Sequence, residues 1–179
     1  MRAPDTFCRQ LLDTLPRLRR YARTLVFDAA SADDLTQNTL ERALAHWHQF
    51  DQRRDMLVWV LSIAHNAFLD SRRRDARLTI ADPEELQRMQ DRGGGDLGPD
   101  VGLRMDLQAA LRRLSPEQRE PLLLVCVEQL SYAEVAEVMH IPIGTVMSRV
   151  CRARATLRQF LDGSAGHGAP AAAVLRRVV

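Results

Sequence analysis

Polar side chains that can bind nucleic acid recur along one predicted helix between Gly144 and Arg158. Apolar residues at i, i+4, i+7 and i+11 give this helix one buried side; they are Val146, Val150, Ala153 and Leu157. Ser148, Arg149, Arg152 and Arg158 alternate with them. Arginine can bind guanine or phosphate through paired N–H donors, and a serine hydroxyl can bind a base edge or a phosphate. The outward side therefore predicts a DNA contact, although a solvated basic helix packed on a bundle would have the same apolar spacing.

A shorter helix is predicted directly before this one. Ser131 and Glu134 form a capping-box pattern in front of apolar residues at helical spacing. Pro142 ends the helix because proline lacks a backbone donor and disfavours helical geometry in the residue before it. Two helices joined by so short a break form a helix-turn-helix, whose second helix lies in a DNA major groove.

A second candidate site lies on a helix predicted over residues 56–74. Trp59 and Asn66 are seven residues apart, hence near one face, and the helix ends in Arg72, Arg73 and Arg74. A ring and an amide can bind bases while arginines follow a single-stranded backbone. A core tryptophan, a capping asparagine and a solvated basic end would explain the same residues, so both interpretations stay open.

Two helices upstream must position this site. Residues 5–27 carry a broad apolar stripe, and Pro16 inside it predicts a kink or two shorter helices. Ser31 is expected to cap the next helix, with Asp34 in the capping-box position. The polar stretch 49–55 is predicted to be a loop. Together with the helix over 56–74, these elements form a predicted first domain at residues 1–77.

The composition changes after residue 77. Residues 78–104 have the glycine and proline content of a linker. Helical periodicity then resumes, and Ser115 before Pro116, with Gln118 three residues after the serine, predicts a capping box. A second domain is predicted at 105–162, followed by a disordered tail at 163–179. The predicted fold class is all-α, with two small helical domains joined by a flexible linker.

The composition of the 179 residues limits the possible functions. The net charge is only +2, so a nucleic-acid surface must be a local patch, and all 25 basic residues are arginine. Cys8, Cys126 and Cys151 form no C-x-x-C pair, which argues against a disulfide framework. No apolar run approaches the ~18 residues that span a bilayer. We therefore expect a soluble, cytoplasmic protein.

Catalytic chemistry finds little support in the sequence. His46 and His48 flank Trp47, but residues at i and i+2 point to different sides of a helix. No phosphate-binding loop, nucleophile elbow or cluster of metal-binding carboxylates is evident. We therefore expect no metal, no cofactor and no enzyme activity.

Three segments, taken in order, resemble an extracytoplasmic-function (group IV) sigma factor of the sigma-70 family. They are DDLTQNTLERALAHW, WVLSIAHNAFLDSRRR and LSPEQREPLLLVCVEQLSYAEVAEVMHIPIGTVMSRVCRAR. The resemblance covers residues 9–77 and 105–160, and LPRLRRYART and TLERALAHW are most similar to the branch linked to general stress responses in alphaproteobacteria.

The resemblance implies a role for particular residues. It assigns four residues to contacts with the β′ clamp helices of core RNA polymerase, or to packing beside them: Asp34, Leu35, Gln37 and Leu40. Binding of the promoter −10 strand falls on Trp59, Asn66, Arg72, Arg73 and Arg74, with Asn66 beside a pocket for a flipped base. Binding of the −35 duplex falls on Thr145, Ser148, Arg149 and Arg152. Implied partners are core RNA polymerase, including its β flap, promoter DNA and an anti-sigma factor.

Some residues depart from the family pattern. Met147, Cys151 and Ser62 replace residues that are common at DNA-facing positions, which leaves the promoter sequence open. His140 stands in a turn whose conformation non-glycine residues adopt less readily. Two other classes of protein remain as alternatives: a helix-turn-helix regulator that binds duplex DNA alone, and a structural interaction protein. Asn66 separates the first from a sigma factor, because such a regulator has no use for single-strand capture.

Overall fold

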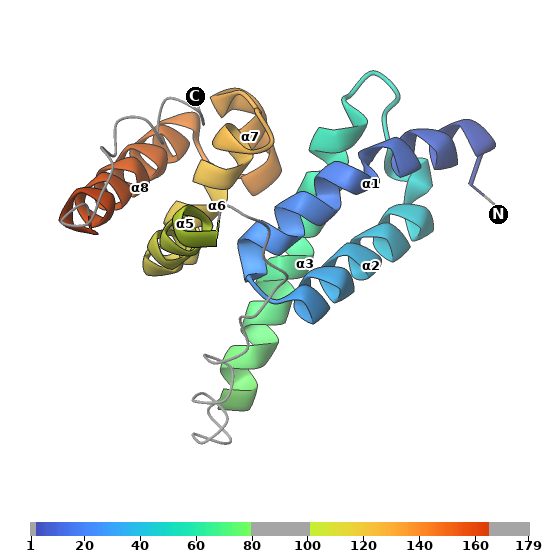
Figure 1. Ribbon diagram of the computed structural model, residues 1–179. Helices are drawn as coiled ribbons and strands as arrows, with labels where there is room; N and C mark the ends of the chain where they lie inside the picture. The colour runs from blue at the N-terminus through green and yellow to red at the C-terminus, as the bar shows by residue number, and fades with distance from the viewer. Residues whose placement is uncertain (1–2, 80–100, 165–179) are drawn as a thin grey trace. The chain divides into compact units, whose positions relative to one another are not determined.

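The computed structural model describes residues 3–79 and 101–164, and the chain divides into two compact units, Met1–Gly95 (unit 1) and Asp96–Val179 (unit 2). Every regular element among the described residues is a helix, which confirms the all-α fold class (Figure 1). Helix α3 runs to Thr79 and helix α5 begins at Val101, so both extend into the predicted linker. The rest of that linker and residues 165–179 of the predicted tail lie outside the described residues.

Unit 1 packs helices α1 (Asp5–Val26), α2 (Ala29–Ala45) and α3 (Met56–Thr79), with a 3-10 turn η1 (Trp47–Gln49) before α3. Each of these α-helices contacts the other two, and Figure 1 shows α1 and α2 side by side against α3. The core includes Leu18, Tyr21, Leu25, Val60 and Leu61, all fully buried. Each such apolar side chain contributes about 1.5–3 kcal/mol on burial, which fixes α3 against the other two helices.

Polar residues in this core are satisfied locally. Thr14, Thr36 and Thr39 are buried, and each hydroxyl donates a 2.7 Å hydrogen bond to a backbone carbonyl one turn earlier. A buried hydroxyl without a partner would be costly. These bonds allow threonine to pack like an apolar residue.

The predicted start of the second helix is wrong. Helix α2 begins at Ala29, and its N-cap is Asp28, whose Oδ2 accepts hydrogen bonds from the backbone N–H (2.8 Å) and the hydroxyl (2.7 Å) of Ser31. The Asp28 carboxylate satisfies both donors, and it stands in front of the first free helical N–H groups. Asp34 therefore lies in the second turn and not in a capping box. Helix α1 also continues through Pro16, which excludes two shorter helices there.

Unit 2 contains helices α5 (Val101–Arg113), α6 (Pro116–Cys126), α7 (Tyr132–Met139) and α8 (Ile143–Ser164). Helix α8 contacts the other three. Its predicted inner face is confirmed, since Val146, Val150, Ala153 and Leu157 are all buried. Leu124, Val135 and Val138, on α6 and α7, are fully buried as well. The apolar spacing read from the sequence therefore orients α8 in its unit.

The capping box predicted at Ser115 is wrong, although α6 does start at Pro116. Among the described residues, the Ser115 side chain makes no capping hydrogen bond. Its backbone carbonyl instead accepts the N–H groups of Gln118 (3.0 Å) and Arg119 (2.8 Å). Proline at the first helical position has no N–H to satisfy, so the helix start needs less capping.

The helix-turn-helix geometry agrees with the prediction. Ser131 Oγ accepts the N–H of Glu134 (3.2 Å), and the Glu134 carboxylate accepts the N–H of Ser131 (2.7 Å), which confirms the capping box of α7. His140 ends α7 in the left-handed region (φ 53°). Helix α8 begins at Ile143, and the Pro142 carbonyl in front of it accepts the N–H groups of Thr145 (2.9 Å) and Val146 (3.2 Å).

Candidate nucleic-acid interface

A pocket of about 220 Å³ lies between α2, η1 and α3. It is lined by Arg42, His46, Gln49, Trp59, Ile63 and Asn66. The structure thus places Trp59 and Asn66 on one pocket, as their seven-residue spacing predicts. An indole ring, two amides, an imidazole and a guanidinium supply the stacking surface, donors and acceptors that can bind a nucleobase outside its duplex.

Trp59 is held in place by other aromatic rings. It is half-buried, and its ring centroid lies 5.9 Å from that of Phe7 and 5.2 Å from that of Phe50. Phe7 belongs to α1, while Phe50 lies in the segment that leads into α3. The Phe7 contact is edge-to-face and the Phe50 contact is tilted, and aromatic contacts of these kinds fix ring orientation beyond simple burial. Trp59 therefore forms a wall of the pocket that three parts of unit 1 support.

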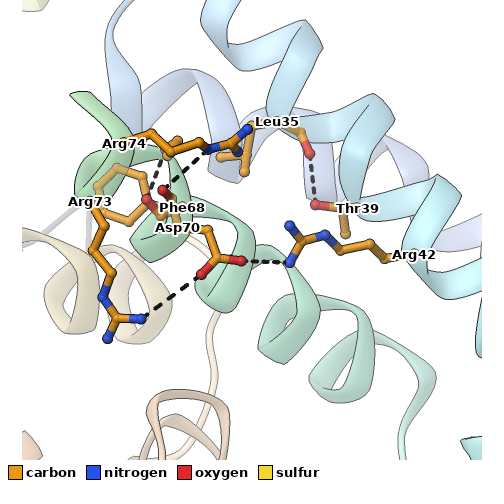
Figure 2. Close-up of polar contacts among 8 residues, drawn as sticks. Leu35, Thr39, Arg42, Phe68, Asp70, Arg73 and Arg74 are labelled. Carbon is orange, nitrogen blue, oxygen red and sulfur yellow. Dashed lines mark hydrogen bonds and ion pairs between the residues drawn. The ribbon is translucent and has the colours of Figure 1, made fainter. Parts of the chain in front are cut away.

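An ion pair fixes Arg42 at the same pocket. Arg42 Nη1 on α2 donates to Asp70 Oδ2 on α3 at 2.9 Å, and Arg73 approaches the other carboxylate oxygen at 3.9 Å (Figure 2). The Arg42 and Asp70 side chains are 36% and 43% exposed, so the pair contributes at most about 1 kcal/mol to stability. Its main effect is to orient the guanidinium beside the pocket and to join α2 to α3.

The predicted helix end at Arg72, Arg73 and Arg74 is wrong, because α3 continues to Thr79. These three arginines are exposed and lie beyond the pocket residues. Arg72 Cζ lies 6.0 Å from the centroid of the Phe68 ring. Arg74 Nε donates to the Asp70 carbonyl at 3.4 Å. The structure therefore does not bring Arg72, Arg73 or Arg74 into the pocket. They are exposed arginines further along the helix that carries Asn66, and Figure 2 shows two of them, Arg73 and Arg74, beside Asp70.

The residues assigned to polymerase contact on α2 divide into two groups. Asp34 and Gln37 are exposed, and Gln37 Nε2 donates to Glu41 Oε1 at 2.9 Å. Leu40 is half-buried, whereas Leu35 is only 7% exposed and packs in the core. Of the two roles considered for Leu35, packing is therefore the one its burial supports.

Leu44, near the end of α2, points away from the core of unit 1. Its side chain is 45% exposed, while its neighbour Ala43 is fully buried. One residue is about 100° of rotation along a helix, so Ala43 takes the inward position and Leu44 faces outward. Leu44 follows Gln37 and Leu40 at helical spacing and extends the same outer face.

The polar side of α8 is partly organised by local hydrogen bonds. Ser148 and Arg152 are exposed, and Thr145 is half-buried. Arg152 donates from Nε to the Ser148 carbonyl at 3.2 Å and from Nη2 to the Ser148 hydroxyl at 3.4 Å. These bonds hold the Arg152 side chain along the helix beside Ser148.

Arg149 and Arg154 face α6, so they are less available for DNA contact than their place in the sequence suggests. Arg149 Nη2 lies 3.4 Å from Glu117 Oε2, and the Arg149 side chain is only 23% exposed. Arg154 Nη2 donates to Cys126 Sγ at 3.7 Å, and this hydrogen bond raises the pKa of Arg154 above its ordinary value. Both arginines therefore join α8 to α6.

Neither a metal-binding cluster nor a membrane-spanning helix occurs in the parts of the chain that the structure describes. There, no group of three or more histidine, cysteine or acidic residues could hold a metal ion. In the same residues, no helix is long and apolar enough to cross a membrane. Cys8, Cys126 and Cys151 are free thiols.

Both units match families of known proteins. Residues 104–157 match sigma-70 region 4, and residues 11–65 match the sigma2 domain of PhyR. The ECF RNA polymerase sigma factor EcfG of Rhodopseudomonas palustris is 34% identical over 167 residues, or 92% of this chain and 91% of that protein. This chain is an ECF RNA polymerase sigma factor. SigC of Mycobacterium tuberculosis, another ECF sigma factor, is 38% identical over 73% of this chain and 70% of its own length.

Solved structures agree with this membership. The sigma factor RpoE of Bartonella quintana, solved in complex with the anti-sigma factor NepR, has a TM-score of 0.77 to this sigma factor at 30% identity. The match covers 89% of this chain and 98% of RpoE. A sigma factor directs core RNA polymerase to specific promoters, so the stand-alone regulator and the purely structural protein are excluded.

Sequence reasoning did not select all the residues that line the pocket of this sigma factor. Arg42, His46 and Gln49 were missed, because their approach to α3 depends on tertiary packing. Arg42 pairs with a residue 28 positions away, and no local pattern indicates such a contact.

Removal of the Glu117 charge is expected to strengthen −35 binding. In Glu117→Gln, Arg149 loses its ionic partner and becomes free to reach a DNA phosphate. An exposed ion pair is worth up to about 1 kcal/mol, so affinity of the holoenzyme for a −35 duplex should rise about twofold to fivefold in a fluorescence anisotropy titration. Asp13→Asn makes the same change in net charge within unit 1 and should have little effect. Weaker binding by Glu117→Gln would mean that Glu117 holds Arg149 in its DNA-contacting position.

Proposed function

We propose that this sigma factor contacts its promoters with two separate surfaces. The exposed side of α8 binds the −35 duplex in the major groove, and the pocket on α3 binds a base flipped out of the −10 strand. The observation that carries the proposal is the convergence of Trp59, Asn66 and Arg42 on one pocket. Packing alone does not require an amide and a guanidinium beside the half-buried Trp59 indole.

Each group in unit 1 has a role in this proposal. The exposed Asn66 amide offers a donor and an acceptor to the edge of a flipped base. Trp59 supplies the apolar wall. Arg72, Arg73 and Arg74 continue along α3 and attract the phosphates of the same strand.

Arg152→Ala is expected to weaken −35 binding about tenfold. A good arginine contact to a base edge contributes about 1–3 kcal/mol, and Ser148 already orients this side chain. The measurement is a competition titration of holoenzyme with −35 duplexes. Arg9→Ala removes an exposed arginine from α1 and serves as the charge control. Equal effects of the two substitutions would argue that Arg152 contributes only general electrostatic attraction.

Core RNA polymerase would hold the two units at the separation that promoters require. We assign the outer face of α2, with Asp34, Gln37, Leu40 and Leu44, to the β′ clamp helices, and unit 2 to the β flap. Leu35 supports this face from inside. Two modest DNA contacts on one assembly reinforce each other, because the first raises the effective concentration of the second. The free protein should therefore bind promoters poorly.

The proposal extends to regulation. An anti-sigma factor would silence this protein by covering the same helices, as a complex with NepR is known for the similar RpoE. The similarity to EcfG supports a role in stress-responsive transcription in the cytoplasm. The chemistry of RNA synthesis would belong to core polymerase, with no enzyme activity in this chain.

Affinity purification of this protein from unstressed cells should recover a small protein inhibitor. Absence of such an inhibitor would contradict the proposed regulation by an anti-sigma factor.

Run-off transcription tests the proposed function directly. Purified core polymerase is incubated with fragmented genomic DNA of the source organism, with and without this protein. Discrete new transcripts that share upstream −35 and −10 sequences are expected. Tight binding to an anti-sigma factor with no stimulated transcription would instead indicate a sigma-like competitor, as in the anti-anti-sigma factor PhyR.

A further inference from the structure

The outward face of α8 carries an apolar column that the contacts proposed above do not use. Ile143 and Met147 are 45% and 48% exposed, and Cys151 is exposed as well. Their spacing of four residues stacks them on one side of the helix. Among the described residues, the other large apolar side chains left this exposed are Leu12 and Leu44, both in unit 1. The core positions of α8 are filled by other residues, so packing within unit 2 does not explain this column.

A polar column runs beside the apolar one. Ser148 and Arg152 each follow an apolar-column residue by one position, and both are exposed. Two of the four arginines within residues 143–160, Arg152 and Arg158, are exposed, and this stretch contains no acidic residue. A partner for this face must therefore be negatively charged and must also offer apolar groups at the same depth. The DNA major groove meets both conditions, because each thymine places a C5-methyl group there beside the acceptors and phosphates.

We propose that Met147 and Cys151, with Ile143 at the start of the helix, contact thymine methyl groups in the −35 duplex. The first turns of a recognition helix lie closest to the base edges, and these residues occupy the first turns of α8. Ser148 and Arg152 then bind the adjacent polar edges or phosphates. The inference rests on the proposed function and adds a chemical determinant of promoter choice: thymine, on either strand, at the positions that face this column.

The test uses deoxyuridine, which differs from thymine only by the missing methyl group. Duplexes bound at −35 are first selected with wild-type holoenzyme, and each thymine is then replaced singly by deoxyuridine. At one or two positions, affinity should fall about threefold to fivefold, as expected for loss of one buried methyl contact. Met147→Ala should cause a similar loss on the thymine duplex and little further loss on the deoxyuridine duplex. Leu12→Ala, an exposed apolar residue of unit 1, should change neither value.

Several results would overturn the inference. One is a deoxyuridine effect of the same size in wild type and in a variant that combines Ile143→Ala, Met147→Ala and Cys151→Ala, since the methyl group would then touch a residue outside the apolar column. Another is a loss of affinity in Met147→Ala that is equally large on the thymine and the deoxyuridine duplex. The apolar column would then contact a protein partner and not the thymine methyl group. Failure of the wild-type holoenzyme to select any −35 duplex would refute the proposed function itself, and so is distinguishable from failure of this inference alone.

Discussion

Asn66→Ala is expected to reduce promoter opening about tenfold or more. The substitution removes the amide that we assign to the edge of a flipped −10 base. A buried base that loses its hydrogen-bond partner costs about 1–3 kcal/mol, and the melted strand is then held less firmly. Because Asn66 is exposed, the fold should tolerate alanine. The measurement is permanganate reactivity of unpaired thymines near −10, together with run-off transcription from a promoter identified as above.

The specificity of this effect can be checked within the same chain. Gln108→Ala removes an exposed amide from α5 in unit 2 and should leave opening unchanged. Asn66→Ala should also leave binding of an isolated −35 duplex unchanged, because the two sites belong to different units. Normal opening by Asn66→Ala would show that the pocket does not receive the base.

Leu61→Ala is expected to destabilise unit 1 severely while sparing unit 2. The Leu61 side chain is fully buried on α3. Loss of a core leucine costs about 2–5 kcal/mol, because the surroundings do not refill the cavity. For a domain of this size, that loss lowers the unfolding midpoint by about 15 °C. Differential scanning calorimetry should show one transition shifted and the other retained.

Leu124→Ala is the matched experiment in the other unit. Leu124 is fully buried on α6, so its substitution should lower only the transition that Leu61→Ala leaves in place. Such reciprocal behaviour would establish that the units predicted at residues 1–77 and 105–162 unfold independently. A single transition lowered by both substitutions would mean that the two units unfold as one cooperative structure.

Local patterns in the sequence account for much of the fold. The apolar spacing of α8 predicts its buried face, because a helix turns by a constant angle and each position has a defined direction. The capping box of α7 and the left-handed turn at His140 are likewise set by residues close in sequence. Where several caps are chemically possible, local reasoning is less secure: Asp28 rather than Ser31 caps α2, since a carboxylate satisfies two donors at once.

The different contributions of sequence and tertiary structure are clearest at the α3 pocket and on the exposed side of α8. The residue types make Asn66, Trp59, Ser148 and Arg152 candidates for nucleic-acid binding, because amides, rings, hydroxyls and guanidinium groups have characteristic partners. Only packing between helices brings Arg42 to the α3 pocket and turns Arg149 toward Glu117. Those contacts join residues 28 and 32 positions apart, a distance over which periodicity carries no information. Sequence thus determines which chemistry each helix can offer, and tertiary structure determines which of those groups meet.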